Sequence, residues 1–230
     1  PGARCDVESL DYSYSFSEQL QQEWSWTERY ASQPEILGYL NHVADRFDLR
    51  RDVRLATRVT SAVFDEIANR WVIQTDRGDR VEARFCIMAT GCLSRAQVPD
   101  FPGLPTFAGR WYHTGHWPHE GVDFTGHRVG IIGTGSSAIQ SIPIIARQAS
   151  HLFVFQRTPN YSIPARNGPL DPEVEQRMKA NYSEHRRRAR ESRVGFVVES
   201  RGQSALAVDH EDREREYDAR WRRGGLGFNQ

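Results

Sequence analysis

The chain has 230 residues, and its 30 Lys and Arg residues balance its 30 Asp and Glu residues, so the formal net charge at pH 7 is zero. This balance argues against a nucleic acid as partner. Hydrophobic residues make up 38% of the chain, and no apolar run reaches the ~20 residues that a bilayer span requires. We therefore expect a cytoplasmic protein with a packed core and no membrane partner.

Neither the cysteines nor the histidines predict a metal site. Cys5, Cys86 and Cys92 are an odd number at unrelated spacings, which indicates no disulfide framework and agrees with a reducing compartment. Histidines recur every three residues from 113 to 119, but Pro118 breaks any helix that would align them as ligands.

The first 90 residues predict a helix followed by an antiparallel meander. Ser32-Gln33-Pro34-Glu35 has the pattern of a capping box, and a helix is predicted over 33–47. Its expected apolar face consists of Ile36, Leu37, Leu40, Val43, Ala44 and Phe47. From Arg54 the period changes to two, which predicts strands at 59–64, 71–75 and 80–83. The apolar run 85–89 predicts a further strand, buried on both faces.

A proline-rich connection over 93–107 is the candidate domain boundary. Beyond it, a strand at 128–132, a glycine turn, a helix over 136–150 bent at Pro143 and a strand at 152–155 predict a β-α-β unit of a parallel sheet. Residues 171–193 and 209–223 are dominated by Arg and Glu, which predicts solvated helices. The chain opens at Pro1 and ends without a closing element, so we expect it to be part of a longer protein.

The sharpest motif is a G-x-G-x-x-A sequence between the strand at 128–132 and the following helix, made of Gly133, Thr134, Gly135, Ser136, Ser137 and Ala138. The first glycine permits a tight turn, the second lets the backbone approach a pyrophosphate, and the helix N-terminus faces the phosphate charge. The motif therefore predicts dinucleotide binding.

The end of the next strand indicates which dinucleotide is bound. Gln156-Arg157-Thr158 stands about 20 residues after the turn, where proteins that bind NAD have a carboxylate for the ribose. An arginine at this place favours NADP over NAD; the alternative is a surface arginine that caps the strand.

A second motif, Phe107-x-Gly109-x-x-x-His113-x-x-x-Trp117-Pro118, follows the proline-rich connection. Taken alone, it is also compatible with a loop that holds a buried aromatic side chain and structural histidines. Together with the glycine turn behind it, it resembles the fingerprint of Baeyer–Villiger monooxygenases, and within that family the phenylacetone and cyclohexanone monooxygenase branch. The segments 1–6, 12–16, 89–91 and 155–159 also look like that family, and the likeness fades after about residue 170.

The resemblance implies an α/β fold with two dinucleotide-binding, Rossmann-like domains, one for FAD and one for NADPH. The domains expected here are a partial FAD domain at 1–92, the core of the NADP domain at 93–157 and the start of a charged helical insertion at 158–230. The implied enzyme is a monomeric, NADPH- and FAD-dependent monooxygenase. It inserts one oxygen atom of O2 next to the carbonyl of a small-molecule ketone and yields an ester or lactone. The FAD glycine motif and the active-site arginine of the family are absent from the sequence, so we expect the isolated chain to be inactive and to bind no FAD.

The resemblance also implies roles for single residues. The catalytic group would consist of Asp6, His113 and Trp117, the last two coupling movement of the NADP domain to the flavin site without touching substrate. Arg4, Cys5 and Asp6 would lie at the nicotinamide and flavin rings, and FAD would be lined by Tyr12, Val59, Thr90 and Gly91. NADP would be bound by Gly133, Thr134, Gly135, Ser136, Ser137, Arg157 and Thr158. For Asp6 the alternative is a turn-forming aspartate, and no base is present to make Cys5 a catalytic thiol.

Two other functions stay open at this point. A flavin monooxygenase that oxygenates nitrogen or sulfur shares the fold and a similar fingerprint, although Trp117-Pro118 argues against it. A non-catalytic NADP-binding module is the second alternative.

Overall fold

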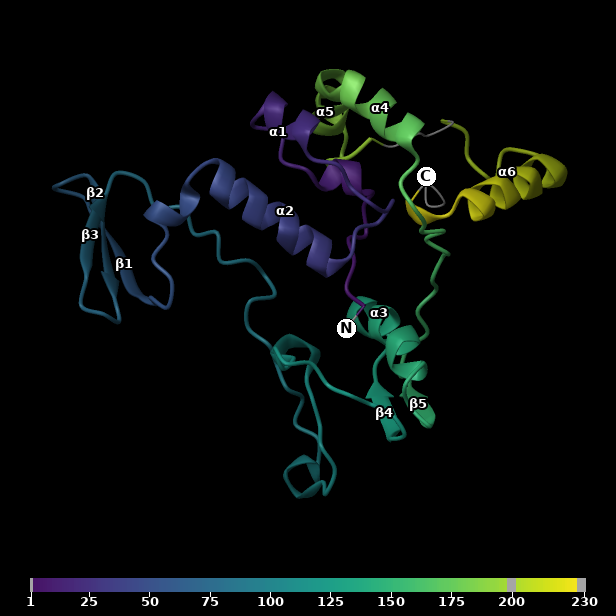
Figure 1. Ribbon diagram of the computed structural model, residues 1–230, viewed down its shortest axis with the longest axis horizontal. Helices are drawn as coiled ribbons and strands as arrows, with labels where there is room; N and C mark the ends of the chain where they lie inside the picture. The colour runs from purple at the N-terminus through teal and green to yellow at the C-terminus, as the bar shows by residue number, and fades with distance from the viewer. Residues whose placement is uncertain (1, 198–201, 227–230) are drawn as a thin grey trace. The chain divides into compact units, whose positions relative to one another are not determined.

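The computed structural model describes residues 2–197 and 202–226 (Figure 1). The chain forms two compact units, a large unit made of Pro1–Ala44 with Val122–Gln230 and a small unit made of Asp45–Gly121. These bounds differ from those of the expected domains, and the division at 93 and 158 stays a prediction about the complete protein. Within the described residues, no helix is both long and apolar enough to cross a bilayer.

The small unit is built on a three-stranded antiparallel sheet, β1 (Val59–Asp65), β2 (Arg70–Thr75) and β3 (Arg80–Ala83), in that order. The predicted meander is confirmed to within one residue at each strand end. Asn69 takes the left-handed φ of 52° that the tight turn between β1 and β2 requires. Phe64 and Trp71 are cross-strand partners with ring centroids 5.5 Å apart, which stabilises the register. Three short 3-10 helices complete this unit: η2 (Leu49–Asp52), η3 (Leu104–Thr106) and η4 (Thr114–His116).

The strand predicted over 85–89 is wrong. The segment forms no strand, and Phe85, Ile87 and Met88 are 74%, 89% and 63% exposed. A doubly buried strand needs a neighbour on each side and cover on both faces, and no described strand pairs with this segment.

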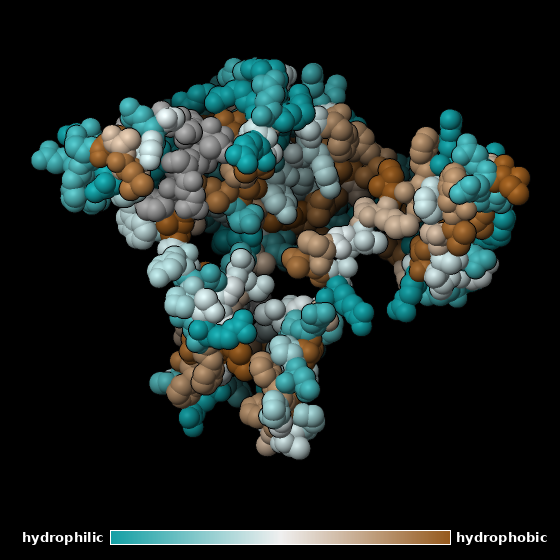
Figure 2. Space-filling model, turned by 180° about the vertical axis from the view of Figure 1, so that it is seen from behind, coloured by the Kyte–Doolittle hydropathy of each residue, from teal (hydrophilic) through white to brown (hydrophobic). Residues whose placement is uncertain are grey.

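Hydrophobic residues, brown in Figure 2, reach the surface in many places of that view, and the exposed apolar side chains include Leu55, Ile67 and Leu93.

The predicted β-α-β unit is confirmed in the large unit. Strands β4 (Arg128–Ile132) and β5 (His151–Phe155) pair in parallel, and helix α3 (Ser136–Ala146) connects them with Pro143 inside it. The helix ends four residues earlier than predicted. Its C-cap is Arg147, and the N–H of Ser150 bonds to the main-chain oxygen of His127, which draws the chain out of the helix and into β5.

The core of the large unit lies around helix α2 (Gln33–Arg46), near which α1 (Glu18–Glu23) and η1 (Ser9–Tyr12) contribute further buried side chains. The helix predicted over 33–47 is confirmed to within one residue, but its buried face matches the expected one only in part. Tyr39 and Val43 are buried, whereas Leu37 and Leu40 are 50% and 41% exposed. The Tyr39 ring packs 5.2 Å from that of Trp24 and 5.1 Å from that of Trp26, a contact with residues distant in sequence.

The expected capping box is also wrong. The Glu35 carboxylate accepts hydrogen bonds from the main-chain N–H and the hydroxyl of Thr27, at 2.6 and 3.0 Å, in place of the main-chain N–H of Ser32. The tertiary partner therefore displaces the local one.

The charged segments form α4 (Pro172–Ala180), α5 (Tyr182–Glu191) and α6 (His210–Arg223). The expectation of solvated helices is wrong for α5, because Tyr182 and Ala189 are only 5% and 4% exposed. The Arg186 guanidinium donates to the main-chain oxygens of Leu10, Asp11 and Ser13 at 3.0, 3.1 and 2.9 Å. The charge run thus contains a buried contact with η1, and the His185 Nε2 adds a hydrogen bond with the Asp11 carboxylate at 2.5 Å.

Candidate dinucleotide site

The glycine turn lies between β4 and α3, as the motif predicts. Gly133 has a φ of 101°, in the left-handed region that favours glycine, and its N–H donates to the main-chain oxygen of Phe155 at 2.8 Å. Gly135 is the N-cap of α3. A Cβ on either glycine would meet no atom within 4 Å, so the space in front of both is open to a ligand.

Thr134, between the two glycines, is held from the end of β5. The Gln156 amide donates to the Thr134 hydroxyl at 3.0 Å, and the Asn160 amide donates to the Thr134 main-chain oxygen at 2.6 Å. The sequence motif includes neither Gln156 nor Asn160 as a contributor to the turn. Their only signal in the sequence is their position just after the second strand of the unit, close to Arg157.

The predicted NADP residues are therefore brought together by the β-α-β unit. Arg157 follows Gln156 directly and is exposed, and within residues 2–197 and 202–226 it makes no hydrogen bond or ion pair. Ser136 and Ser137 open α3, and Thr158 is exposed beside Arg157. A helix N-terminus with open glycines and an uncommitted guanidinium is a donor set that suits a pyrophosphate and a 2′-phosphate. The residues present thus fit NADP.

The fingerprint residues lie in the small unit. A Cβ on Gly109 would come within 2.7 Å of two ring carbons of Phe107, so the ring lies where any other side chain at 109 would stand. Gly115 approaches its neighbours as closely, because an added Cβ would lie 2.7 Å from that of Ala96. Gly115 is a residue that the sequence analysis missed, since a single glycine in a loop carries no signal for a close contact.

His113 orders this loop directly. Its Nδ1 accepts the N–H of Gly115 at 3.1 Å, so in the neutral ring the proton is on Nε2. The main-chain oxygen of His113 accepts from the N–H of His116 at 2.8 Å. Trp117 stacks in a tilted geometry on Tyr112, with ring centroids 5.8 Å apart. The side chains of His113 and Trp117 are both half-buried.

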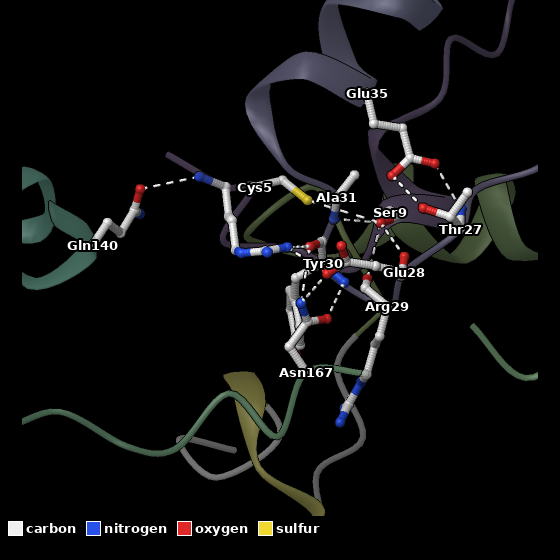
Figure 3. Close-up of polar contacts among 11 residues, drawn as sticks. Cys5, Ser9, Thr27, Glu28, Arg29, Tyr30, Ala31, Glu35, Gln140 and Asn167 are labelled. Atoms are coloured by element: carbon white, nitrogen blue, oxygen red, sulfur yellow. Dashed lines mark hydrogen bonds and ion pairs between the residues drawn. The ribbon is translucent and has the colours of Figure 1, made fainter. Parts of the chain in front are cut away.

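The N-terminal segment with Arg4, Cys5 and Asp6 lies in the large unit, against Ala31–Gln33. Figure 3 shows Cys5 of this segment near Ala31 and Ser9. The Arg4 guanidinium pairs with the Glu28 carboxylate and donates to the main-chain oxygen of Tyr30 at 3.0 Å, and its main-chain N–H donates to the Gln140 side chain on α3 at 3.1 Å. The positive charge of Arg4 is thus compensated within the chain.

The other predicted cofactor residues differ in their surroundings. Cys5 is 7% exposed, and burial raises the pKa of its thiol, which agrees with a residue that does not react. Asp6 is exposed, and Tyr12 is 45% exposed. Val59 (57% exposed), Thr90 and Gly91 lie in the small unit. Tyr12 thus belongs to the large unit and the other three predicted FAD residues to the small unit, and their assignment to FAD stays a prediction. Among the described residues, no three His, Cys, Asp or Glu side chains form a group that could hold a metal ion.

Comparisons with known proteins place this geometry in a family. The pyridine nucleotide-disulphide oxidoreductase family matches residues 7–218. A Baeyer-Villiger monooxygenase of Pseudooceanicola batsensis is 44% identical, and the phenazine N-monooxygenase PhzNO1 of Lysobacter antibioticus is 40% identical; each match covers 99% of this chain. A solved structure of an oxidized steroid monooxygenase bound to NADP is 62% identical and superposes with a TM-score of 0.93, over 100% of this chain and 44% of that one.

The chain spans 42% of the length of both curated relatives. The similarity to Baeyer–Villiger monooxygenases that the fingerprint indicated is confirmed. So is the α/β fold with a Rossmann-type nucleotide-binding unit. Because the family match extends over nearly the whole chain, from residue 7 through the glycine turn and into α6, the chain belongs to the pyridine nucleotide-disulphide oxidoreductase family.

Proposed function

We propose that the complete protein containing this chain is an NADPH- and FAD-dependent Baeyer–Villiger monooxygenase that converts a ketone and O2 to an ester or lactone. The observation that carries the proposal is the presence in one chain of an open glycine turn beside Arg157 and of a fingerprint loop ordered by His113. The similarity to a Baeyer-Villiger monooxygenase over 99% of the chain supports it. A monomeric state and a cytoplasmic location stay predictions.

The chain's own residues would hold the nicotinamide cofactor through its phosphates. The N–H groups of Gly135, Ser136 and Ser137 stand at the positive end of α3 and suit the pyrophosphate, and the Arg157 guanidinium suits the 2′-phosphate. When bound, NADPH supplies a hydride, and FAD activates O2 for insertion next to the carbonyl carbon.

The predicted residues at the rings have supporting roles in this proposal. Since the Arg4 guanidinium is engaged by Glu28 and Tyr30 and the Cys5 thiol is buried, both would form a fixed wall of the site. Asp6 is exposed and free to orient a cationic side chain from the rest of the protein. His113 and Trp117 would transmit movement through their loop, because His113 bonds to Gly115 and Trp117 packs on Tyr112 within it.

The test is product analysis of the complete protein, purified with FAD and supplied with NADPH, O2 and a panel of aryl and cyclic ketones. An ester or lactone formed in proportion to the NADPH consumed is the expected result. Oxidation of NADPH without ester or lactone from any ketone of the panel would refute the proposal.

The similarity to a phenazine N-monooxygenase makes nitrogen oxygenation the second candidate. An aromatic N-heterocycle and a sulfide, assayed beside the ketones, distinguish the two reactions by their products.

His113→Ala is expected to lower the yield of product per NADPH, and His116→Ala, in the same loop but outside the fingerprint, is the matched control.

A further inference from the structure

Asn160 lies outside the dinucleotide motif, yet its side chain binds the main chain at the centre of the glycine turn. Its Nδ2 donates to the Thr134 main-chain oxygen at 2.6 Å, from the loop that follows β5. Asn160 is thus connected to the turn across 26 residues of sequence. It can therefore act on a bound dinucleotide through the main chain, without touching the ligand.

The Thr134 oxygen determines where the next N–H group points. Peptide groups are planar, and the described chain has no cis peptide bond, so the C=O of Thr134 and the N–H of Gly135 point in opposite directions. A hydrogen bond that fixes the Thr134 oxygen on the side of Asn160 therefore directs the Gly135 N–H away from it.

That N–H has no partner within the described part of the protein. Across residues 2–197 and 202–226, no acceptor bonds to the N–H of Gly135, and a Cβ on Gly135 would meet nothing within 4 Å. Gly135 does not fix this orientation by itself, because glycine permits a wide range of main-chain angles. The turn needs a restraint from outside, and two side chains after β5 supply it: Gln156, on the Thr134 hydroxyl, and Asn160, on the Thr134 oxygen.

We propose that Asn160 is a positioning residue for the dinucleotide, which presents the Gly135 N–H to the pyrophosphate by holding the Thr134 oxygen on the opposite side. This role rests on the proposed use of a nicotinamide dinucleotide and deepens it. It differs from the role of Arg157, because the pyrophosphate is common to NADP⁺ and NAD⁺ whereas the 2′-phosphate belongs to NADP⁺ only.

Three ligands separate the role of Asn160 from that of Arg157. Dissociation constants of the complete protein are measured by calorimetry for NADP⁺, NAD⁺ and 2′-AMP, the last of which has the 2′-phosphate but no pyrophosphate. Asn160→Ala should raise the constants for NADP⁺ and NAD⁺ by the same factor, about threefold to tenfold for one lost hydrogen bond, and leave that for 2′-AMP unchanged. Arg157→Ala should weaken NADP⁺ and 2′-AMP and leave NAD⁺ unchanged.

A matched control is available on α4. The Asn181 amide donates to the Arg177 main-chain oxygen at 2.9 Å, the same type of bond at a helix end outside the turn, so Asn181→Ala should change none of the three constants. Asn160→Asp keeps the shape of the side chain but replaces the donor by a carboxylate that repels the Thr134 oxygen, and it should weaken both dinucleotides more than Asn160→Ala does.

The inference is overturned if Asn160→Ala and Asn160→Asp bind NADP⁺ and NAD⁺ as the wild type does, or if they weaken 2′-AMP as much as NADP⁺. A wild-type protein that binds neither dinucleotide would refute the proposed function itself, and this role with it. Failure of the inference alone is thus distinguishable from failure of the function.

Discussion

The contact between α5 and the N-terminal segment should depend on Arg186 far more than on its neighbour Arg187. The Arg186 side chain is 13% exposed and donates to three main-chain oxygens at 2.9 to 3.1 Å. Its guanidinium also lies 5.4 Å from the centre of the Tyr182 ring. Arg186→Ala would leave the three oxygens without their donor in a place with little access to water.

The magnitude is set by the charge and burial of the group. Hydrogen bonds to a charged donor contribute about 1.5 to 3 kcal/mol each, and removal of one partner of a buried ionic contact costs about 3 to 5 kcal/mol in all. Taking about 3 kcal/mol, local opening of this contact becomes roughly a hundredfold more frequent. Hydrogen exchange of the amides of Ser9 and Asp11, which are hydrogen-bonded in the wild type, should accelerate by that factor.

Arg187→Ala is the matched control on the same helix. Its side chain is 52% exposed and pairs with Glu184 and Glu191, so little change in exchange is expected. Arg186→Met keeps most of the side-chain volume and separates packing on Tyr182 from hydrogen bonding; most of the loss should persist in it. Equal acceleration in the Arg186 and Arg187 variants, or none in either, would refute the reasoning.

Three further predictions concern the two motifs and the N-terminal segment. Gly115→Ala should lower the free energy of unfolding by about 1 to 3 kcal/mol, because its Cβ would overlap that of Ala96. Adding Ala96→Gly to this variant should restore the midpoint of thermal unfolding, and an unchanged midpoint in the double variant would contradict the contact. Arg157→Ala should raise the KM for NADPH tenfold to a hundredfold, because about 1.5 to 3 kcal/mol of charge-assisted bonding is lost, and should leave the KM for NADH unchanged. An equal rise in KM for both coenzymes would argue against a contact with the 2′-phosphate. Because burial raises the pKa of the Cys5 thiol, less thiolate is present at pH 8, and iodoacetamide should label Cys5 more slowly than the exposed Cys92 by mass spectrometry; equal rates would contradict its burial.

Local patterns determined the elements around the site. The meander, the order of strand, glycine turn, helix and strand, and the parallel pairing of β4 with β5 all result from periodicity and turn residues, which act between neighbours in the chain. The same locality explains why the glycine turn and Arg157 can be assigned to one site from the sequence. A β-α-β crossover brings the start of its helix and the end of its second strand to one edge of the sheet.

What the sequence alone could not determine depends on partners outside the residue's own helix or turn, from 8 residues away for Glu35 to 176 for Arg186. Glu35 binds Thr27 in place of Ser32, α2 buries Tyr39 against two tryptophans, and the charged α5 contributes Arg186 to η1. Asn160 reaches Thr134 across 26 residues. In each case the partner that a polar or aromatic group contacts is supplied by a segment outside its own helix or turn. Helix periodicity and capping rules carry no information about that choice of partner, because it is decided by packing between segments that only folding brings together.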